Sequence, residues 1–318
     1  MKKIFTILVA LTLVVSLGLF AAGSKEGGKK TVAFIQVDNQ NPWRLAETES
    51  IKSEAAKRGY ELKYTDAQAV QANQIAAMRD FIAQGVDGII LAPMTSTGWE
   101  PVLKEAKEAK IPVVLVDRNV DAPADLVVTF IGSDFVQEGE RIAKMMIEDL
   151  GEGPLNVVEL QGQPGADPTI DRKKGFENVI KNYPKIKITM SQTGQFNRTQ
   201  GKQVMEAFLR AAGKDIDVVY AHNDDMAIGA IQAIKEYGLK PGKDIYVYSI
   251  DGVRDAFVAM KNGELNGCVE CTPLMGPAAF DALEAAWAGK ELPDWIVNED
   301  QAFRSKDVTD EVLKSRKY

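Results

Sequence analysis

The chain has 318 residues and a formal net charge of −7, with 45 acidic against 38 basic side chains. This length is enough to bury a full core and predicts two domains of ordinary size. The acidic balance argues against nucleic acid as a partner.

The amino-terminal residues predict an export signal. Lys2 and Lys3 precede an apolar run over 4–20, which ends at the small residues 21–23. This order is typical of a secretory signal peptide, here 1–23. A transmembrane anchor is the alternative, because the apolar run approaches the length that spans a bilayer. A flexible spacer at 24–30 follows, and no later apolar stretch is long enough to cross a membrane, so we expect an exported chain without stable membrane insertion after signal removal.

From residue 31 onward, short β-branched runs alternate with helical patterns. The first half predicts strands at 32–37, 62–64, 88–92, 111–116 and 127–133, separated by helices that include 46–58, 73–84 and 101–109. Gly59 and Gly85 follow two of these helices as left-handed stops. This alternation predicts one open sheet with helices on both faces.

The segment after the first strand combines polar residues with a tryptophan. Asn41 suits a helix cap and Pro42 the first helical turn, so Trp43 and Arg44 should lie beside the strand's end. Trp43 could stack on the apolar face of a sugar ring while Arg44 donates to hydroxyls. Simple packing of Trp43 between helix and sheet explains the segment equally well.

The strand at 111–116 ends in Asp117 and Arg118. A carboxylate only accepts hydrogen bonds and a guanidinium only donates them, so the pair could reach different hydroxyls of one ring. A surface ion pair is the equally weighted alternative.

After 132–134 the alternating pattern restarts. It predicts strands at 157–160, 186–190, 218–220, 245–250 and 265–271, with helices that include 137–150, 199–211, 226–234 and 254–262. A helix at 274–289 then indicates a return of the chain to the first unit. The expected fold is α/β, with two doubly wound parallel-sheet lobes, 31–132 plus 272–296 and 133–271 plus 297–318. Three crossovers, near Gly132, Cys271 and Ile296, would join them.

The segment His222-Asn223-Asp224-Asp225 separates a buried strand from a helix. Open α/β sheets hold ligands at such strand ends. Asp224 or Asp225 could cap the helix, which would leave Asn223 facing the crevice. Polar residues stand at five predicted strand exits, which we expect to meet at one cleft: Asp38, Asp117, Gln161, Asn223 and Asp251.

Two further segments of the second unit offer ligand-binding groups. The glycine-rich loop at 161–167 lacks the phosphate-binding fingerprints and predicts a close approach of backbone to ligand. Arg172 follows on the next helix, and Phe196, after the strand at 186–190, offers a second aromatic wall.

The chain has two cysteines, Cys268 and Cys271, in a segment that we expect to be extended. Residues three apart on a strand point to opposite faces, so a disulfide would require the strand to bend. The spacing also resembles half a zinc site or a redox pair, but no second half exists and His222 is the only histidine. We therefore expect structural or ligand-lining thiols, with no metal and no cofactor.

Several segments together resemble the type I periplasmic sugar-binding proteins of ABC importers, the family of ribose and galactose binders. The segments that carry the resemblance are 41–43, 117–118, 159–162, 171–176, 221–226 and 250–252. Within the family, 98–107, 156–162, 220–236 and 249–253 look most like the bacterial galactofuranose binders. Arg44 supports this choice, because ribose binders carry an aromatic residue there.

The resemblance implies a monomer that captures a monosaccharide in an interlobe cleft of the periplasm and delivers it to an ABC transporter permease. It implies ligand contacts from Asn41, Trp43, Arg44, Asp117, Arg118, Arg172, Phe196, Asn223 and Asp251. Cys271 stands where the family has a glutamine, so that contact could fall to Cys271 or to neighbouring Glu270.

Four other functions compete with a galactofuranose importer. The protein could bind another aldose, such as ribose, arabinose or galactose, or present a sugar to a chemoreceptor. A glycosidase would need two opposed carboxylates, and Asp117 and Asp251 could serve, but each has an arginine or asparagine to pair with. No nucleophilic serine, cysteine or histidine constellation supports an enzyme. A sugar-responsive repressor would need a helix-turn-helix where this chain has its signal.

Overall fold

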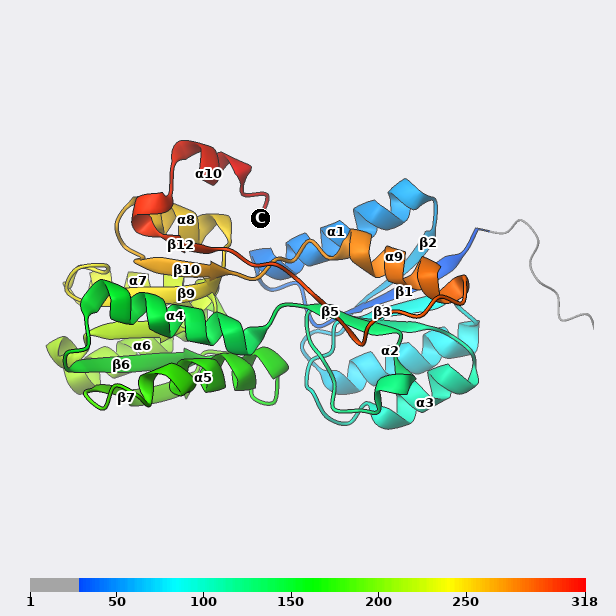
Figure 1. The fold of residues 1–318 in the computed structure, drawn as a ribbon, viewed down its shortest axis with the longest axis horizontal. Helices are drawn as coiled ribbons and strands as arrows, with labels where there is room; N and C mark the ends of the chain where they lie inside the picture. The colour runs from blue at the N-terminus through cyan, green and yellow to red at the C-terminus, as the bar shows by residue number, and fades with distance from the viewer. Residues whose placement is uncertain (1–28) are drawn as a thin grey trace, which may run out of the picture.

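The computed structural model describes residues 29–318. The expected signal peptide, 1–23, and most of the spacer lie outside the described residues. Two lobes lie side by side, each built on a six-stranded sheet (Figure 1). Among residues 29–318, no helix has both the length and the apolar character needed to cross a membrane.

The first lobe is a parallel sheet in the order β11-β5-β4-β3-β1-β2. Its strands are β1 Thr31–Gln36, β2 Glu61–Asp66, β3 Gly88–Leu91, β4 Val113–Val116, β5 Thr129–Gly132 and β11 Trp295–Val297. Its helices are α1 Pro42–Arg58, α2 Gln71–Gln84, α3 Glu100–Glu108, α9 Gly276–Trp287 and the 3₁₀ turn Ala124–Leu126. Every residue of β3, β4 and β5 is buried, which explains the unbroken apolar sequences of β3 and β4.

The second lobe has the strand order β12-β10-β9-β8-β6-β7. Its strands are β6 Leu155–Gln161, β7 Ile186–Thr193, β8 Val218–Ala221, β9 Tyr246–Asp251, β10 Gly267–Glu270 and β12 Ala302–Arg304. Its helices are α4 Phe135–Leu150, α5 Asp167–Ile180, α6 Arg198–Ala212, α7 Asp224–Glu236, α8 Arg254–Lys261 and α10 Asp310–Ser315, with 3₁₀ turns at Gly213–Asp215 and Ser305–Asp307. The edge strand β12 runs antiparallel to β10, so this sheet is not purely parallel as expected.

The chain passes between the lobes three times, after β5, after β10 and after β11 (Figure 1). β11 pairs with β5 of the first sheet, whereas β12 pairs with β10 of the second. The last passage therefore lies at 298–301. All three passages are short. Residues at or just after the ends of β1, β4, β8 and β9 line one cavity, so the carboxyl ends of these strands face the space between the lobes.

Local signals set the start and end of the first helix as predicted. Asn41 caps α1, where its side chain accepts a hydrogen bond from the Arg44 backbone N–H at 2.8 Å, and Pro42 is the first helical residue. The helix stops at Gly59, which has a φ of 79°. This geometry places Trp43 and Arg44 beside the end of β1.

Candidate ligand-binding site

One cavity lies between the lobes at the carboxyl ends of strands from both sheets. It encloses about 310 Å³ of atom-free space, including the open space at its mouth. Its lining residues are Asn41, Trp43, Arg44, Asp117, Arg118, Pro168, Arg172, Phe196, Asn223, Asp251 and Cys271. The structure thus brings together Cys271 and the nine residues from which the family resemblance implies ligand contacts, and it adds Pro168, at the start of α5.

The prediction that five strand exits meet at one cleft is wrong for Asp38 and Gln161, which do not line this cavity. Asp38 turns back on its own loop, where it accepts from the Gln40 backbone N–H at 2.9 Å. Gln161 donates to Glu159 and to Ser191 at the outer edge of the second sheet.

Paired charges form the first-lobe side of the cavity. Arg44 donates to Asp117 at 2.5 Å and to Glu47 at 2.7 Å, and the Nε of Arg118 lies 3.3 Å from the same Asp117 carboxylate. All four side chains are buried. Burial alone would lower the pKa of Arg44, but Asp117 and Glu47 outweigh it and raise that pKa. Arg44 is therefore a fixed cation, held by two carboxyl groups.

Glu47 and Arg118 have pKa values that are closer to 7 than their ordinary values. Burial raises the pKa of Glu47 to about 7, against the influence of Arg44. Burial and the neighbouring Arg44 lower the pKa of Arg118 to about 10, which leaves Arg118 protonated at neutral pH. The first-lobe wall therefore presents two guanidinium groups and the carboxylate of Asp117 to the cavity.

Arg172 organises the second-lobe side. Its guanidinium donates to Glu138 at 2.7 Å, to Asp251 at 3.3 Å and to the His222 carbonyl at 2.6 Å. Burial alone would lower its pKa, but Glu138 and Asp251 raise it. Burial also raises the pKa of Asp251, and that of Glu138 to about 7, although Arg172 opposes both shifts. Each lobe thus contributes an arginine bound to an aspartate.

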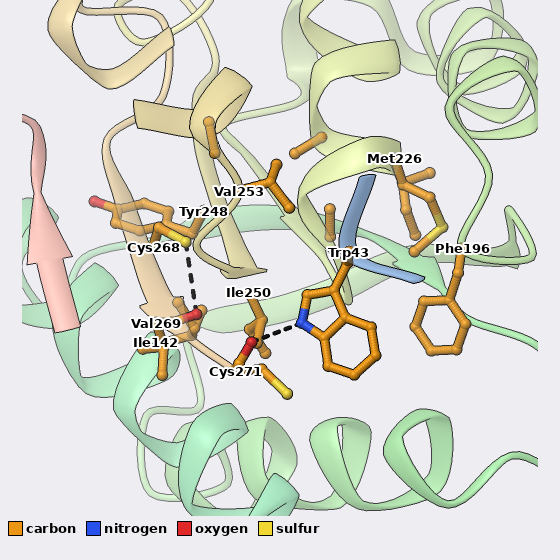
Figure 2. Packing of buried hydrophobic residues seen from close by; sticks show 14 of the residues in the cluster. Trp43, Ile142, Phe196, Met226, Tyr248, Ile250, Val253, Cys268, Val269 and Cys271 are labelled. Atoms are coloured by element: carbon orange, nitrogen blue, oxygen red, sulfur yellow. Dashed lines mark hydrogen bonds between the residues drawn. The ribbon is translucent and has the colours of Figure 1, made fainter. Parts of the chain in front are cut away.

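Two aromatic side chains form apolar parts of the wall. Trp43 donates its indole N–H to the Cys271 carbonyl at 2.6 Å, and Figure 2 shows this bond with Phe196 beyond the indole ring. The guanidinium carbons of Arg118 and Arg172 lie 5.5 and 6.0 Å from the Phe196 ring centroid. Trp43 is only 4% exposed, so it packs in the core and lines the cavity at once.

Asn223 caps α7, and the prediction that Asp224 or Asp225 caps it is wrong. The Asn223 side chain accepts from the Met226 backbone N–H at 3.0 Å, and Asp224 and Asp225 are the first helical residues. Asn and Asp fit a cap equally well, so the sequence alone could not separate them. The Asn223 amide group also donates to the Phe196 carbonyl at 3.4 Å, which leaves it at the cavity wall.

The two cysteines are free buried thiols with different surroundings. Cys271 lines the cavity, and burial raises its pKa, so it is protonated. Cys268 lies on β10 and donates to Asp224 at 3.3 Å. Glu270 does not line the cavity, because it pairs with Arg316 and accepts from Tyr318 of the carboxyl-terminal segment.

Three cavity residues have a backbone conformation that side-chain-bearing residues rarely adopt. Asp117, Phe196 and Asp251 have φ values of 65°, 56° and 125°. They are three of the seven non-glycine residues with positive φ in the described chain. Such strain persists only where the surrounding structure enforces it, and it concentrates at functional sites. No sequence pattern predicted it.

Direct contacts between the lobes close the cavity near the glycine-rich loop. The Ser96 backbone N–H donates to the Gly165 carbonyl at 3.0 Å, and the Asn119 N–H donates to Asp167 at 3.1 Å. Arg118 donates to Gln163 at 3.1 Å. The loop at 161–167 and the first residue of α5 therefore hydrogen-bond to the opposite lobe, and the two lobes are in direct contact in this structure.

The chain is similar to known periplasmic and sugar-binding proteins. The family model described as periplasmic binding protein domain matches residues 32–291. The galactofuranose-binding protein YtfQ of Escherichia coli (strain K12) is 52% identical, over 90% of this chain and 91% of that protein. The ribose import binding protein RbsB of Bacillus subtilis (strain 168) is 34% identical, over 93% of this chain and 97% of that protein.

Two solved structures resemble this one throughout. A crystal structure of a galactofuranose-binding protein superposes with a TM-score of 0.89 at 52% identity, covering 91% of this chain and 98% of that chain. The periplasmic binding protein component of the arabinose ABC transporter from Shewanella sp. ANA-3, bound to α- and β-L-arabinofuranose, has a TM-score of 0.88 at 49% identity, covering 90% and 96%.

Proposed function

Because the chain belongs to the periplasmic binding protein family, we propose that it captures one monosaccharide between its lobes and delivers it unchanged to an ABC transporter permease. One observation carries the proposal. Two arginine–aspartate pairs, Arg44 with Asp117 and Arg172 with Asp251, face one small cavity from opposite lobes. Guanidinium groups donate and carboxylates accept, so together they match the hydroxyl groups around a sugar ring.

We propose that the ligand contacts come from the residues first identified in the sequence. These are Asn41, Trp43, Arg44, Asp117, Arg118, Arg172, Phe196, Asn223, Asp251 and Cys271. The indole of Trp43 and the ring of Phe196 supply apolar faces for the carbon skeleton. A ligand that leaves one of the buried polar groups unpaired loses about 1 to 3 kcal/mol, so the ring form and the hydroxyl pattern are discriminated.

The proposed ligand is a sugar in its furanose form, with galactofuranose as the first candidate. This choice follows the relatives, because one is a galactofuranose-binding protein and another was solved with arabinofuranose. Ribose, arabinose or galactose in another ring form are the alternatives.

The ion pairs of the two cavity aspartates support binding of the sugar without catalysis. Asp117 is held by Arg44 at 2.5 Å and Asp251 by Arg172 at 3.3 Å, so neither is a free nucleophile or base. Two of the relatives named above, the ribose import binding protein and the component of the arabinose ABC transporter, are binding proteins of sugar importers. We propose that the protein works as a monomer in the periplasm after its signal is removed, and that a permease or a chemoreceptor recognises the closed form.

A thermal-shift panel on the exported chain tests this proposal. Galactose, arabinose, ribose and glucose are added at equal concentration, and calorimetry follows on those that stabilise the protein. A ligand present at one hundred times its Kd stabilises the folded state by about 2.7 kcal/mol. We expect stabilisation by sugars that populate a furanose ring. Equal melting temperatures with and without every sugar would contradict the proposal.

A further inference from the structure

We propose that Asp224, which lies outside the cavity, is a positioning residue that aims Asp251 at the ligand. The inference rests on the proposed function, because Asp251 is one of the proposed sugar contacts. It assigns a task to a buried carboxylate that touches neither the cavity nor a cation among the residues that the structure describes.

Asp251 needs an external constraint. It is the last residue of β9, its φ is 125°, and Gly252 follows with a φ of 81°. A non-glycine residue relaxes from such a conformation unless its neighbours hold it. Relaxation of the backbone at this point would turn the carboxylate away from the cavity and from the Arg172 guanidinium, 3.3 Å away.

Asp224 binds the chain on both sides of this strained residue. One carboxylate oxygen accepts the backbone N–H groups of Gly252 and Val253 at 2.7 and 2.8 Å. The other oxygen accepts from the Ser249 hydroxyl and from the Cys268 thiol. The side chain is fully buried, in the first turn of α7. The strand before Asp251 and the turn after it are thus fastened to one group.

The chemistry requires a carboxylate rather than an amide. Four donors converge on the two oxygens of Asp224, and an asparagine offers only one acceptor oxygen and would direct an N–H₂ group at two of the donors. The neighbouring Asp225 provides a matched control. It is also buried, in the same helical turn, but it pairs with Arg198 at 2.8 Å, and among the residues that the structure describes it makes no hydrogen bond to the turn at 251–253.

Calorimetric titration of the stabilising sugar into wild type, Asp224→Asn and Asp225→Asn separates positioning from simple structural support. We expect Asp224→Asn to weaken binding at least tenfold, and Asp225→Asn less than twofold. If Asp224 acts through Asp251, then adding Asp224→Asn to Asp251→Ala weakens binding by less than a further twofold. Loss of stability alone would not produce this dependence on Asp251.

Ser249→Ala removes one donor to Asp224 and is a milder variant, in case Asp224→Asn does not fold. We expect it to weaken binding twofold to fivefold. If Asp224→Asn binds sugar within twofold of the wild-type affinity, the inference is overturned while the proposed function stands. The same result for Ser249→Ala overturns it where Asp224→Asn does not fold. The inference is also overturned if the double variant loses affinity by the product of the factors measured for Asp224→Asn and Asp251→Ala alone. No binding by wild type overturns both.

Discussion

Replacing Arg172 by alanine would leave two buried carboxyl groups without their cation. Glu138 and Asp251 lie 2.7 and 3.3 Å from the Arg172 guanidinium, and all three side chains are almost completely buried. Removal of one partner from a buried ion pair typically destabilises a protein by about 3 to 5 kcal/mol. For a lobe of this size, that loss lowers the melting temperature by roughly 2 to 4 °C per kcal/mol.

The loss should depend on pH in a defined direction. Burial already raises the pKa of Glu138 to about 7 and raises that of Asp251, and Arg172 opposes both shifts. Without Arg172 both pKa values rise further. A carboxyl group whose folded pKa is raised contributes stability that is present below its unfolded pKa and is lost as the pH rises through its folded pKa. Arg172→Ala should therefore be least harmful near pH 5 and most harmful near pH 8.

Urea unfolding of wild type and variant at both pH values measures this difference. Arg79→Ala is the control, because Arg79 and its partner Glu105 are 52% and 41% exposed, and exposed pairs contribute at most about 1 kcal/mol. A destabilisation by Arg172→Ala that is equal at pH 5 and pH 8, or larger at pH 5, would refute the reasoning. An equal loss for Arg79→Ala would show that burial of the ion pair does not matter.

Three further predictions concern single side chains of the cavity. Trp43→Phe removes the bond to the Cys271 carbonyl, and urea unfolding should show a loss of about 1 to 3 kcal/mol; an unchanged midpoint would count against that bond. Asn223→Ala removes the cap of α7 and should destabilise the protein by about 0.5 to 2 kcal/mol, whereas Asn223→Asp keeps the cap but loses the amide donor. Calorimetry should find weak sugar binding in both variants. Normal binding by Asn223→Asp would exclude the amide group as a ligand contact. Ellman's reagent should label the buried Cys271 slowly, and bound sugar should lower the labelling rate of Cys271 further without changing that of Cys268. A labelling rate of Cys271 that does not depend on sugar would contradict its place in the binding cavity.

The sequence could predict the order of strands and helices because each leaves a local pattern. Unbroken apolar runs indicated β3, β4 and β8, and Asn41 with Pro42 indicated the start of α1. Strand ends then indicated where polar groups should gather. β12 was missed because three residues are too few to show a periodic pattern.

The rest of the site depends on contacts between segments that are far apart in the chain. Glu138 meets Arg172 across 34 positions, and nothing near Glu138 distinguishes it from other helical glutamates. The direction of a side chain after a strand depends on the local turn, which is why Asp38 and Asp117 leave similar strands yet only Asp117 reaches the cavity. The choice between Asn223 and Asp224 as cap likewise depends on Ser249, Gly252 and Val253, which already occupy the Asp224 carboxylate.

Titration calorimetry with a furanose sugar tests most directly whether both lobes hold one ligand. The proteins compared are wild type, Asp117→Asn from the first lobe and Asp251→Asn from the second. We expect one sugar bound per chain, with an affinity that each variant weakens at least tenfold, about 1.4 kcal/mol. The absence of binding heat in wild type, or a variant of either lobe that binds as tightly as wild type, would contradict capture between the lobes.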